Sequence, residues 1–180
     1  MLAIVPFKGL DGAKTRLATV LTAEERATLA ARMLELVLAA CEGAATIGRT
    51  LLVTPDPSTL ADGVDVLVDA GTGHADAVAL ALADSRARAG ALILMADCPL
   101  VEADSIDALV EAARPLALAP SHDGGVNALA LRHMDGFIPR FGVGLEKTIA
   151  SARAAHLDPV VVRDERLAFD VDRPADLARL

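Results

Sequence analysis

Short apolar runs that do not alternate with polar residues recur along this chain. The first covers Leu2 to Pro6, and a second covers Ala91 to Ala96. Runs of this kind are typical of strands that are buried on both faces of a parallel sheet. Comparable runs predict further strands at 49–54, 64–68, 116–120, 126–131, 160–162 and 168–172.

Segments with helical spacing of apolar residues lie between these runs. Thr22 and Glu25 have the spacing of a capping box, which predicts a helix start, and Gly43 is a typical helix stop. The alanine-rich stretch from His74 to Ala89 predicts a second helix. Further helices are expected from an Asp104 cap to Arg114, from Leu145 to His156, and after Pro174.

The order of these elements indicates the fold class. The first half reads strand, helix, strand, strand, helix, strand, which predicts an α/β fold with a mostly parallel sheet and right-handed crossovers. In the second half, the turn 121–125 separates two strands that we expect to be antiparallel. The chain has no internal repeat, linker or low-complexity tract, so residues 1–180 are expected to form a single domain.

Composition narrows the class of protein. The chain has 180 residues, enough for one sizeable core, and a net charge of −8 without any Trp or Tyr. These values disfavour a nucleic-acid surface, which needs a basic face or an aromatic platform. No apolar run approaches the roughly 20 residues of a membrane helix, and no signal-peptide pattern is present, so we expect a cytoplasmic enzyme. Cys41 and Cys98 lack the spacing of a zinc site or a disulfide framework.

A loop with two glycines and three cations follows the first strand. Its cations are Lys8, Lys14 and Arg16. A Walker A motif would require a glycine before Lys14, where this chain has Ala13, so a P-loop is disfavoured. Ligands of open α/β sheets bind beyond the carboxyl ends of the strands, which favours a triphosphate site here over a solvated surface loop.

Carboxylates follow two other predicted strands. Asp97 ends the run from Ala91 and is placed either to hold Mg²⁺ or to cap the next helix. Asp170 and Asp172 form an Asp-x-Asp pair, whose side chains point to one face of a strand. We expect Asp170 to bind metal with Asp97 and leave Asp172 as either a ligand or a cap before Pro174. A magnesium site opposite a cationic loop is the layout that nucleotidyl transfer needs.

Together these motifs resemble the phospholactate guanylyltransferases of deazaflavin coenzyme (coenzyme F420) biosynthesis, which are relatives of the molybdenum-cofactor and sugar nucleotidyltransferases. The resemblance is carried by segments in family order: 5–8, 13–17, 97–100, 124–129, 141–144 and 170–172. It implies a Rossmann-like nucleotidyltransferase fold with three α/β/α layers. It also implies that GMP passes from GTP to the phosphate of 2-phospho-L-lactate, phosphoenolpyruvate, 3-phosphoglycerate or a similar acid, with release of pyrophosphate.

The resemblance assigns expected roles to individual residues. Lys14, Arg16 and Asp97 would be catalytic through positioning and charge neutralisation, because an anionic acceptor phosphate needs no general base. Asp97 and Asp170 would hold Mg²⁺. The nucleotide would contact Pro6, Lys8, Lys14, Arg16, Gly71, Gly73 and Asp97. The acceptor pocket would be lined by Gly124, Gly125, Asn127, Gly142 and Gly144, with the helix start at Leu145 offering N–H groups to an anion.

Three departures from the family pattern leave alternatives open. Val126 and Leu145 replace residues with hydroxyl groups, Thr and Ser, which concerns the identity of the acceptor. His74-Ala75 replaces a Leu-Asn pair, which concerns the preference for guanine. A nucleotide-binding module without turnover, or a nucleotidyltransferase for another cofactor or a sugar phosphate, stays an alternative. A homodimer is also left open.

Overall fold

The computed structural model describes residues 1–56, 64–133, 137–139 and 142–180. Within these ranges a seven-stranded sheet lies at the centre. Its strands are β1 (Leu2–Pro6), β2 (Arg49–Thr54), β3 (Asp65–Val68), β4 (Ala91–Leu94), β5 (Leu116–Pro120), β6 (Val126–Leu131) and β7 (Val160–Val161). Across the sheet they follow the order β3-β2-β1-β4-β6-β5-β7.

Strand directions confirm a mostly parallel sheet with an antiparallel portion. β3, β2, β1 and β4 pair in parallel, and β7 pairs in parallel with β5. β6 runs antiparallel to both β4 and β5, as expected for the two strands joined by the turn at 121–125. The carboxyl ends of β1 and β4 therefore lie side by side at one edge of the sheet, next to the start of β6.

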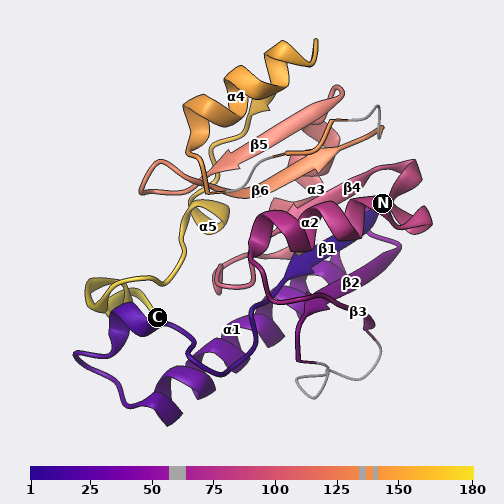
Figure 1. Cartoon of the computed structure of the whole chain (residues 1–180). Coiled ribbons are helices and arrows are strands. Elements are labelled where there is room, and N and C mark those ends of the chain that lie inside the picture. Colours follow the sequence, from indigo (N-terminus) through magenta and orange to yellow (C-terminus); the bar gives the residue numbers. More distant parts are fainter. Residues whose placement is uncertain (57–63, 134–136, 140–141) are drawn as a thin grey trace.

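Helices cover both faces of this sheet, which confirms the three-layer arrangement (Figure 1). Alternate residues of β1 point to opposite faces, so Val5 packs toward α1 and α3 while Ile4 packs toward α2 and α4. The helices are α1 (Ala23–Gly43), α2 (His74–Ala83), α3 (Ala103–Ala112), α4 (Leu145–Ala154) and α5 (Glu165–Ala168). The described residues also form the 3-10 helices η1 (Thr15–Leu17), η3 (Ser85–Ala89) and η4 (Pro174–Arg179).

No helix in the described ranges has the length and apolar character needed to cross a membrane.

The start of α1 confirms the capping box. The Thr22 hydroxyl accepts a hydrogen bond from the Glu25 backbone N–H at 3.2 Å, and the Glu25 carboxylate accepts one from the Thr22 N–H at 2.7 Å. Two N–H groups without helical partners are thereby satisfied, which fixes where the helix begins.

The predicted helix from His74 to Ala89 is wrong in its second half. α2 ends at Ala83, and Asp84 has an extended backbone. The Asp84 carboxylate accepts a hydrogen bond from the Arg86 N–H at 2.9 Å and starts the separate 3-10 helix η3. An aspartate that caps a new turn competes with continuation of the old helix, and the alanine-rich pattern concealed this.

The helix predicted from Asp104 to Arg114 exists with shifted ends. Glu102 occupies the N-cap position of α3 and Asp104 lies within its first turn, so the predicted Asp104 cap is wrong. The helix ends at Ala112, two residues before the predicted Arg114. Such shifts at frayed helix ends are common.

The strand predicted over 168–172 is also wrong. Asp164 accepts hydrogen bonds from the N–H groups of Arg166 and Leu167 and caps the short helix α5, which ends at Ala168. Beyond α5 the chain leaves the sheet, because Phe169 and Val171 pack into a separate apolar cluster with Leu17 and Met33. The terminal segment after Pro174 is helical as predicted, but it is a 3-10 helix.

Candidate active site

A cavity of about 1010 Å³ opens at the carboxyl ends of β1 and β4. The loops after these strands, the start of α2, the turn before β6, the start of α4 and the segment after α5 surround it. Twelve of the predicted site residues line it: Pro6, Lys8, Lys14, Arg16, Gly73, Asp97, Gly124, Gly125, Asn127, Gly142, Gly144 and Asp170. The structure thus gathers residues from both ends and the middle of the chain around one space.

Gly71 is the predicted site residue that does not line this cavity. Its backbone φ of +68° belongs to the left-handed region that favours glycine, and a Cβ atom there would lie 3.4 Å from Cβ of Pro55. Gly71 therefore shapes the turn after β3 against Pro55, and its contact with nucleotide stays a prediction. Phe141, which belongs to one of the motifs, lies outside the described residues.

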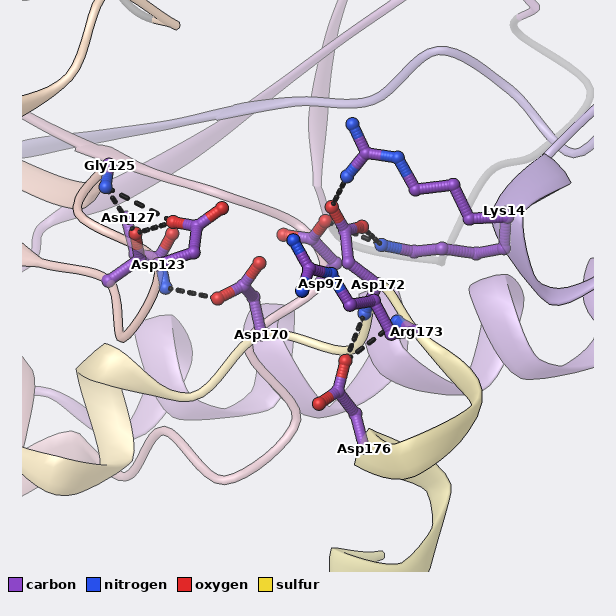
Figure 2. A network of polar contacts seen from close by, with 11 residues as sticks. Lys14, Asp97, Asp123, Gly125, Asn127, Asp170, Asp172, Arg173 and Asp176 are labelled. Atoms are coloured by element: carbon purple, nitrogen blue, oxygen red, sulfur yellow. Dashed lines mark hydrogen bonds and ion pairs between the residues drawn. The ribbon is translucent and has the colours of Figure 1, made fainter.

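Three carboxylates face a common space on one side of the cavity (Figure 2). Oxygen atoms of Asp97, Asp170 and Asp172 all lie within 4.8 Å of one another. The backbone holds them together, because the Val171 N–H donates to the Asp97 carbonyl at 3.2 Å. Phe169 and Val171 are buried, so the alternating Asp170 and Asp172 side chains point the other way. The same-face geometry expected for Asp-x-Asp is therefore present, although this segment is not a strand.

Asp172 belongs to this cluster and does not cap η4. Arg173 occupies the N-cap position, and the Asp176 carboxylate accepts hydrogen bonds from the N–H groups of Asp172 and Arg173 at 3.0 and 2.7 Å. The Asp172 side chain is thereby left to pair with the cationic loop. The metal-site alternative for Asp172 is consequently the one that the geometry favours.

Lys14 approaches the carboxylates from the loop after β1 (Figure 2), and Arg16 follows it in η1. Lys14 Nζ lies 2.6 Å from Oδ2 of Asp97 and 2.9 Å from Oδ1 of Asp172. Arg16 Nη1 lies 2.5 Å from the other oxygen, Oδ2, of Asp172. The Lys14 side chain is 12% exposed and that of Arg16 is 66% exposed, so the Lys14 pairs are partly buried and the Arg16 pair is exposed.

The close approach of these charges shifts the pKa values of Lys14 and Asp170. Burial alone would lower the pKa of Lys14, but the Asp97 and Asp172 carboxylates outweigh it, and the pKa is raised. Burial raises the pKa of Asp170, and the negative charges of Asp97 and Asp172 raise it further. A cation placed among the three carboxylates would remove the repulsion that disfavours an ionised Asp170.

Asn127 is placed to support Asp170. Its side-chain amide donates to Oδ1 of Asp170 at 3.2 Å (Figure 2). The same amide nitrogen donates to the Leu167 carbonyl at 3.0 Å. Asn127 lines the cavity, as predicted, yet its amide orients a carboxylate rather than standing free for an acceptor. The sequence did not indicate this contact, which joins β6 to the segment after α5.

The glycine-rich turn before β6 is tightly bonded within itself. The Gly125 N–H donates to the Ser121 hydroxyl at 2.7 Å and to the Asp123 carboxylate at 3.1 Å. A Cβ atom on Gly125 would lie only 2.8 Å from the Ser121 oxygen, which explains the glycine. Hydrogen bonds from the Ser121 hydroxyl and Gly125 hold the pKa of Asp123 below its usual value. The sequence predicted the turn at 121–125, but not that Ser121 and Asp123 line the cavity.

The start of α4 is attached to this turn. The Leu145 N–H donates to the Gly124 carbonyl at 2.9 Å, so it is not free to bind an anion as the sequence suggested. The side chains of Leu145 and Val126 both pack against the core cluster beneath α4, and Val126 also lines the cavity. Of the two departures that concern the acceptor, only Val126 therefore faces the space where ligands can bind.

His74 lines the cavity at the first residue of α2. Burial and the nearby positive charge of Lys8 lower its pKa, which favours a neutral imidazole. The sequence indicated His74 only as a departure from the family pattern. It lies at the start of α2, where the charge of Lys8 reaches it.

Comparison with solved structures shows the fold. The chain has a TM-score of 0.79 and 18% identity to a candidate nucleotide-diphospho-sugar transferase of Desulfovibrio desulfuricans, covering 98% of this chain and 84% of the other. A nucleotidyl transferase of Methanothermobacter matches with a TM-score of 0.69 and 14% identity, covering 99% and 94% of the two chains. The fold is therefore that of the nucleotidyltransferases.

Comparison of sequences shows the family. The chain is 42% identical to a phosphoenolpyruvate guanylyltransferase of Sphaerobacter thermophilus, over 99% of this chain and 91% of that protein. It is 34% identical to a 2-phospho-L-lactate guanylyltransferase of Halorubrum lacusprofundi, over 100% of this chain and 83% of that protein. The family described as guanylyl transferase, CofC like, matches residues 1–180. The chain therefore belongs to the CofC-like guanylyltransferase family.

Proposed function

We propose that this chain is a magnesium-dependent guanylyltransferase that moves GMP from GTP to the phosphate of a three-carbon phospho-acid and releases pyrophosphate. The observation that carries the proposal is the cavity in which three carboxylates face the cationic loop after β1. Neither group alone identifies the reaction. Their combination suits transfer of a nucleotidyl group, in which charge on a triphosphate must be neutralised while the leaving group departs.

The three carboxylates suit Mg²⁺ by their chemistry. Asp97, Asp170 and Asp172 offer oxygen ligands within 4.8 Å of one another, and Mg²⁺ prefers carboxylate and phosphate oxygens. Bound there, the ion would neutralise charge on the phosphates of the nucleotide. Asn127 orients Asp170 through its hydrogen bond, and the Val171 N–H fixes the segment against the Asp97 carbonyl.

The cations of the loop after β1 are proposed to hold the triphosphate. Lys8, Lys14 and Arg16 all line the cavity, and their charges would stabilise negative charge that develops on the departing pyrophosphate. Pro6 and Gly73 bring the ends of β1 and of the turn before α2 to the same cavity. The base would lie toward His74 and Ala75, which both line it.

The acceptor is proposed to be phosphoenolpyruvate or 2-phospho-L-lactate, the substrates in the names of the two relatives. Both acids combine a phosphate with a carboxylate on three carbons. The acceptor phosphate is itself the nucleophile, so positioning by Gly124, Gly125, Gly142 and Gly144 is sufficient and no general base is required. We also propose that residues 1–180 act as one catalytic domain in the cytoplasm, where nucleoside triphosphates are made.

The experiment that tests this function is an assay of pyrophosphate release with Mg²⁺. GTP, ATP and CTP would each be combined with phosphoenolpyruvate, 2-phospho-L-lactate and 3-phosphoglycerate, and the products identified by mass. We expect turnover with GTP and one of the first two acids, and a product that contains GMP joined to that acid. Binding of GTP without turnover on any acceptor would contradict the proposed reaction and favour a nucleotide-binding module.

A further inference from the structure

The Lys14 ammonium lies where a divalent cation would be expected. It contacts Asp97 and Asp172 at 2.6 and 2.9 Å, and both belong to the three-carboxylate cluster. We propose that Lys14 is a placeholder that occupies the cation site in the unliganded protein and is displaced when a divalent cation binds. This inference builds on the metal site of the proposed function and adds an exchange of ligands within it.

The need for a placeholder follows from charge repulsion. Three carboxylates within 4.8 Å of one another repel when ionised, and the Asp97 and Asp172 side chains are only 24% and 32% exposed. One ammonium group bonded to two of them offsets this repulsion without any bound ion. Lys14 thereby keeps the cluster together in the empty protein.

Displacement follows from the same contacts. A divalent cation that uses Oδ2 of Asp97 and Oδ1 of Asp172 would bind the two atoms that Lys14 Nζ now contacts. The Lys14 ammonium and the divalent cation would repel each other at these oxygens, so the singly charged ammonium must leave. The cavity offers the ammonium a new partner when a triphosphate is bound, because Lys14 lines it together with Lys8.

Arg16 is unsuited to this role. Among the described residues its one ion pair is with Asp172, on the oxygen Oδ2 that Lys14 does not use, and its side chain is 66% exposed. A lysine is a compact charge on a flexible stem, whereas the guanidinium of arginine is a planar fork. Displacement by the cation is therefore assigned to Lys14, while Arg16 keeps its ion pair with Asp172.

The test measures binding of Mn²⁺ alone, without nucleotide, by titration followed by electron paramagnetic resonance. The variants are Lys14→Met and the matched control Lys8→Met, which removes the same charge from another part of the cavity wall. Removing a competitor tightens binding, so Lys14→Met should lower the Mn²⁺ dissociation constant by roughly tenfold. Lys8→Met should change it much less, since only the general field of the cavity is altered.

Thermal unfolding provides the second measurement. Without a divalent cation, Lys14→Met should unfold at a lower temperature than the wild type, because three carboxylates are left facing one another. Adding Mn²⁺ should raise the unfolding temperature of Lys14→Met more than that of the wild type.

An unchanged or weaker Mn²⁺ affinity of Lys14→Met would overturn the placeholder, and so would an equal gain in Lys8→Met. Absence of Mn²⁺ binding to every variant would overturn it together with the metal site of the proposed function. A third outcome is that Lys14→Met binds Mn²⁺ more tightly while the wild type shows no turnover of GTP. That outcome would support displacement of Lys14 by the cation and contradict only the proposed reaction.

Discussion

At the scale of single residues, the cavity wall brings carboxylates and cations into contact. Asp97, Asp170 and Asp172 face Lys14 and Arg16, and each cation contacts at least one carboxylate. Ion pairs that are partly shielded from water are costly to break by removing one partner, because the other is left without compensation. Substitutions here should therefore alter both ligand binding and the stability of the fold.

Asp97→Asn removes a carboxylate charge while keeping the shape of the side chain. Because Asp97 is proposed to hold the metal, we expect Mg²⁺-dependent pyrophosphate release to fall by at least about a hundredfold. The control is Asp104→Asn, an exposed residue in the first turn of α3. Activity of Asp97→Asn within a few-fold of the wild type would remove Asp97 from the proposed metal site.

Val126→Thr tests the one acceptor-side departure that lines the cavity. A hydroxyl added beside a bound carboxylate contributes about 1–3 kcal/mol when it forms a hydrogen bond. We expect kcat/KM for the preferred phospho-acid to change by one to two decades while the KM for GTP stays constant. If Val126→Thr keeps the wild-type ratio of kcat/KM between the two phospho-acids, then Val126 does not contact the acceptor.

At the scale of elements, the site depends on a small apolar cluster. Leu17 at the end of η1 packs with Met33 of α1 and with Phe169 and Val171 after α5. These contacts hold the cationic loop against the segment that carries Asp170 and Asp172. Figure 1 shows the same arrangement, with the C-terminal end of the chain beside the loop after β1.

Leu17→Ala should both destabilise the protein and loosen the site. Leu17 is fully buried, and truncation of a buried leucine costs about 2–5 kcal/mol of unfolding free energy. Leu38→Ala, in the core cluster beneath α1, is the matched control. Urea denaturation should show a loss in both variants, but only Leu17→Ala should weaken Mn²⁺ binding. Equal Mn²⁺ affinities would mean that the cluster does not position the site.

The junction between α2 and η3 depends on the ionisation of Asp84. Hydrogen bonds from the Arg86 side chain and N–H lower the pKa of Asp84 from 3.8 to about 2. A lowered pKa in the folded state means that the stabilisation is complete above pH 4 and is lost as the pH falls toward 2.

Asp84→Asn removes this pH-dependent stabilisation. Urea denaturation of the wild type and of Asp84→Asn should therefore differ in unfolding free energy at about pH 6, and the difference should shrink as the pH falls through about 3. A difference that stays constant over this range would show that the charge of Asp84 does not contribute.

At the scale of the whole molecule, the cavity joins the two ends of the chain. Lys14 comes from the loop after β1, Asp97 from the loop after β4, and Asp172 from the segment after α5. A ligand that contacts all three links the elements that would separate on unfolding. Ligand binding should therefore stabilise the molecule as a whole.

GTP with Mg²⁺ should raise the temperature of thermal unfolding. A ligand at a hundred times its dissociation constant adds about 2.7 kcal/mol to the unfolding free energy. Differential scanning calorimetry with GTP, with Mg²⁺ and with both would show the largest shift for the combination. A combined shift no greater than that of Mg²⁺ alone would contradict a shared site for nucleotide and metal.

Sequence pattern predicted a helix or strand best where the residues of that element alone decide its structure. The strands Leu2–Pro6, Arg49–Thr54, Leu116–Pro120 and Val126–Leu131 follow directly from apolar runs, and the Thr22 capping box determines the start of α1. Prediction failed where two local preferences compete, as at Asp84, or where distant packing decides, as for Phe169 and Val171.

Side-chain type and short-range order were sufficient to predict the class of fold, the family, and twelve of the residues that line the cavity. Which of these residues contact one another depends on how the whole chain folds. Lys14 contacts Asp97 and Asp172, which lie 83 and 158 positions further along the chain, and no local pattern encodes such contacts. They arise because parallel strands end at one edge of the sheet and because buried apolar residues pull the last segment back to the first loop.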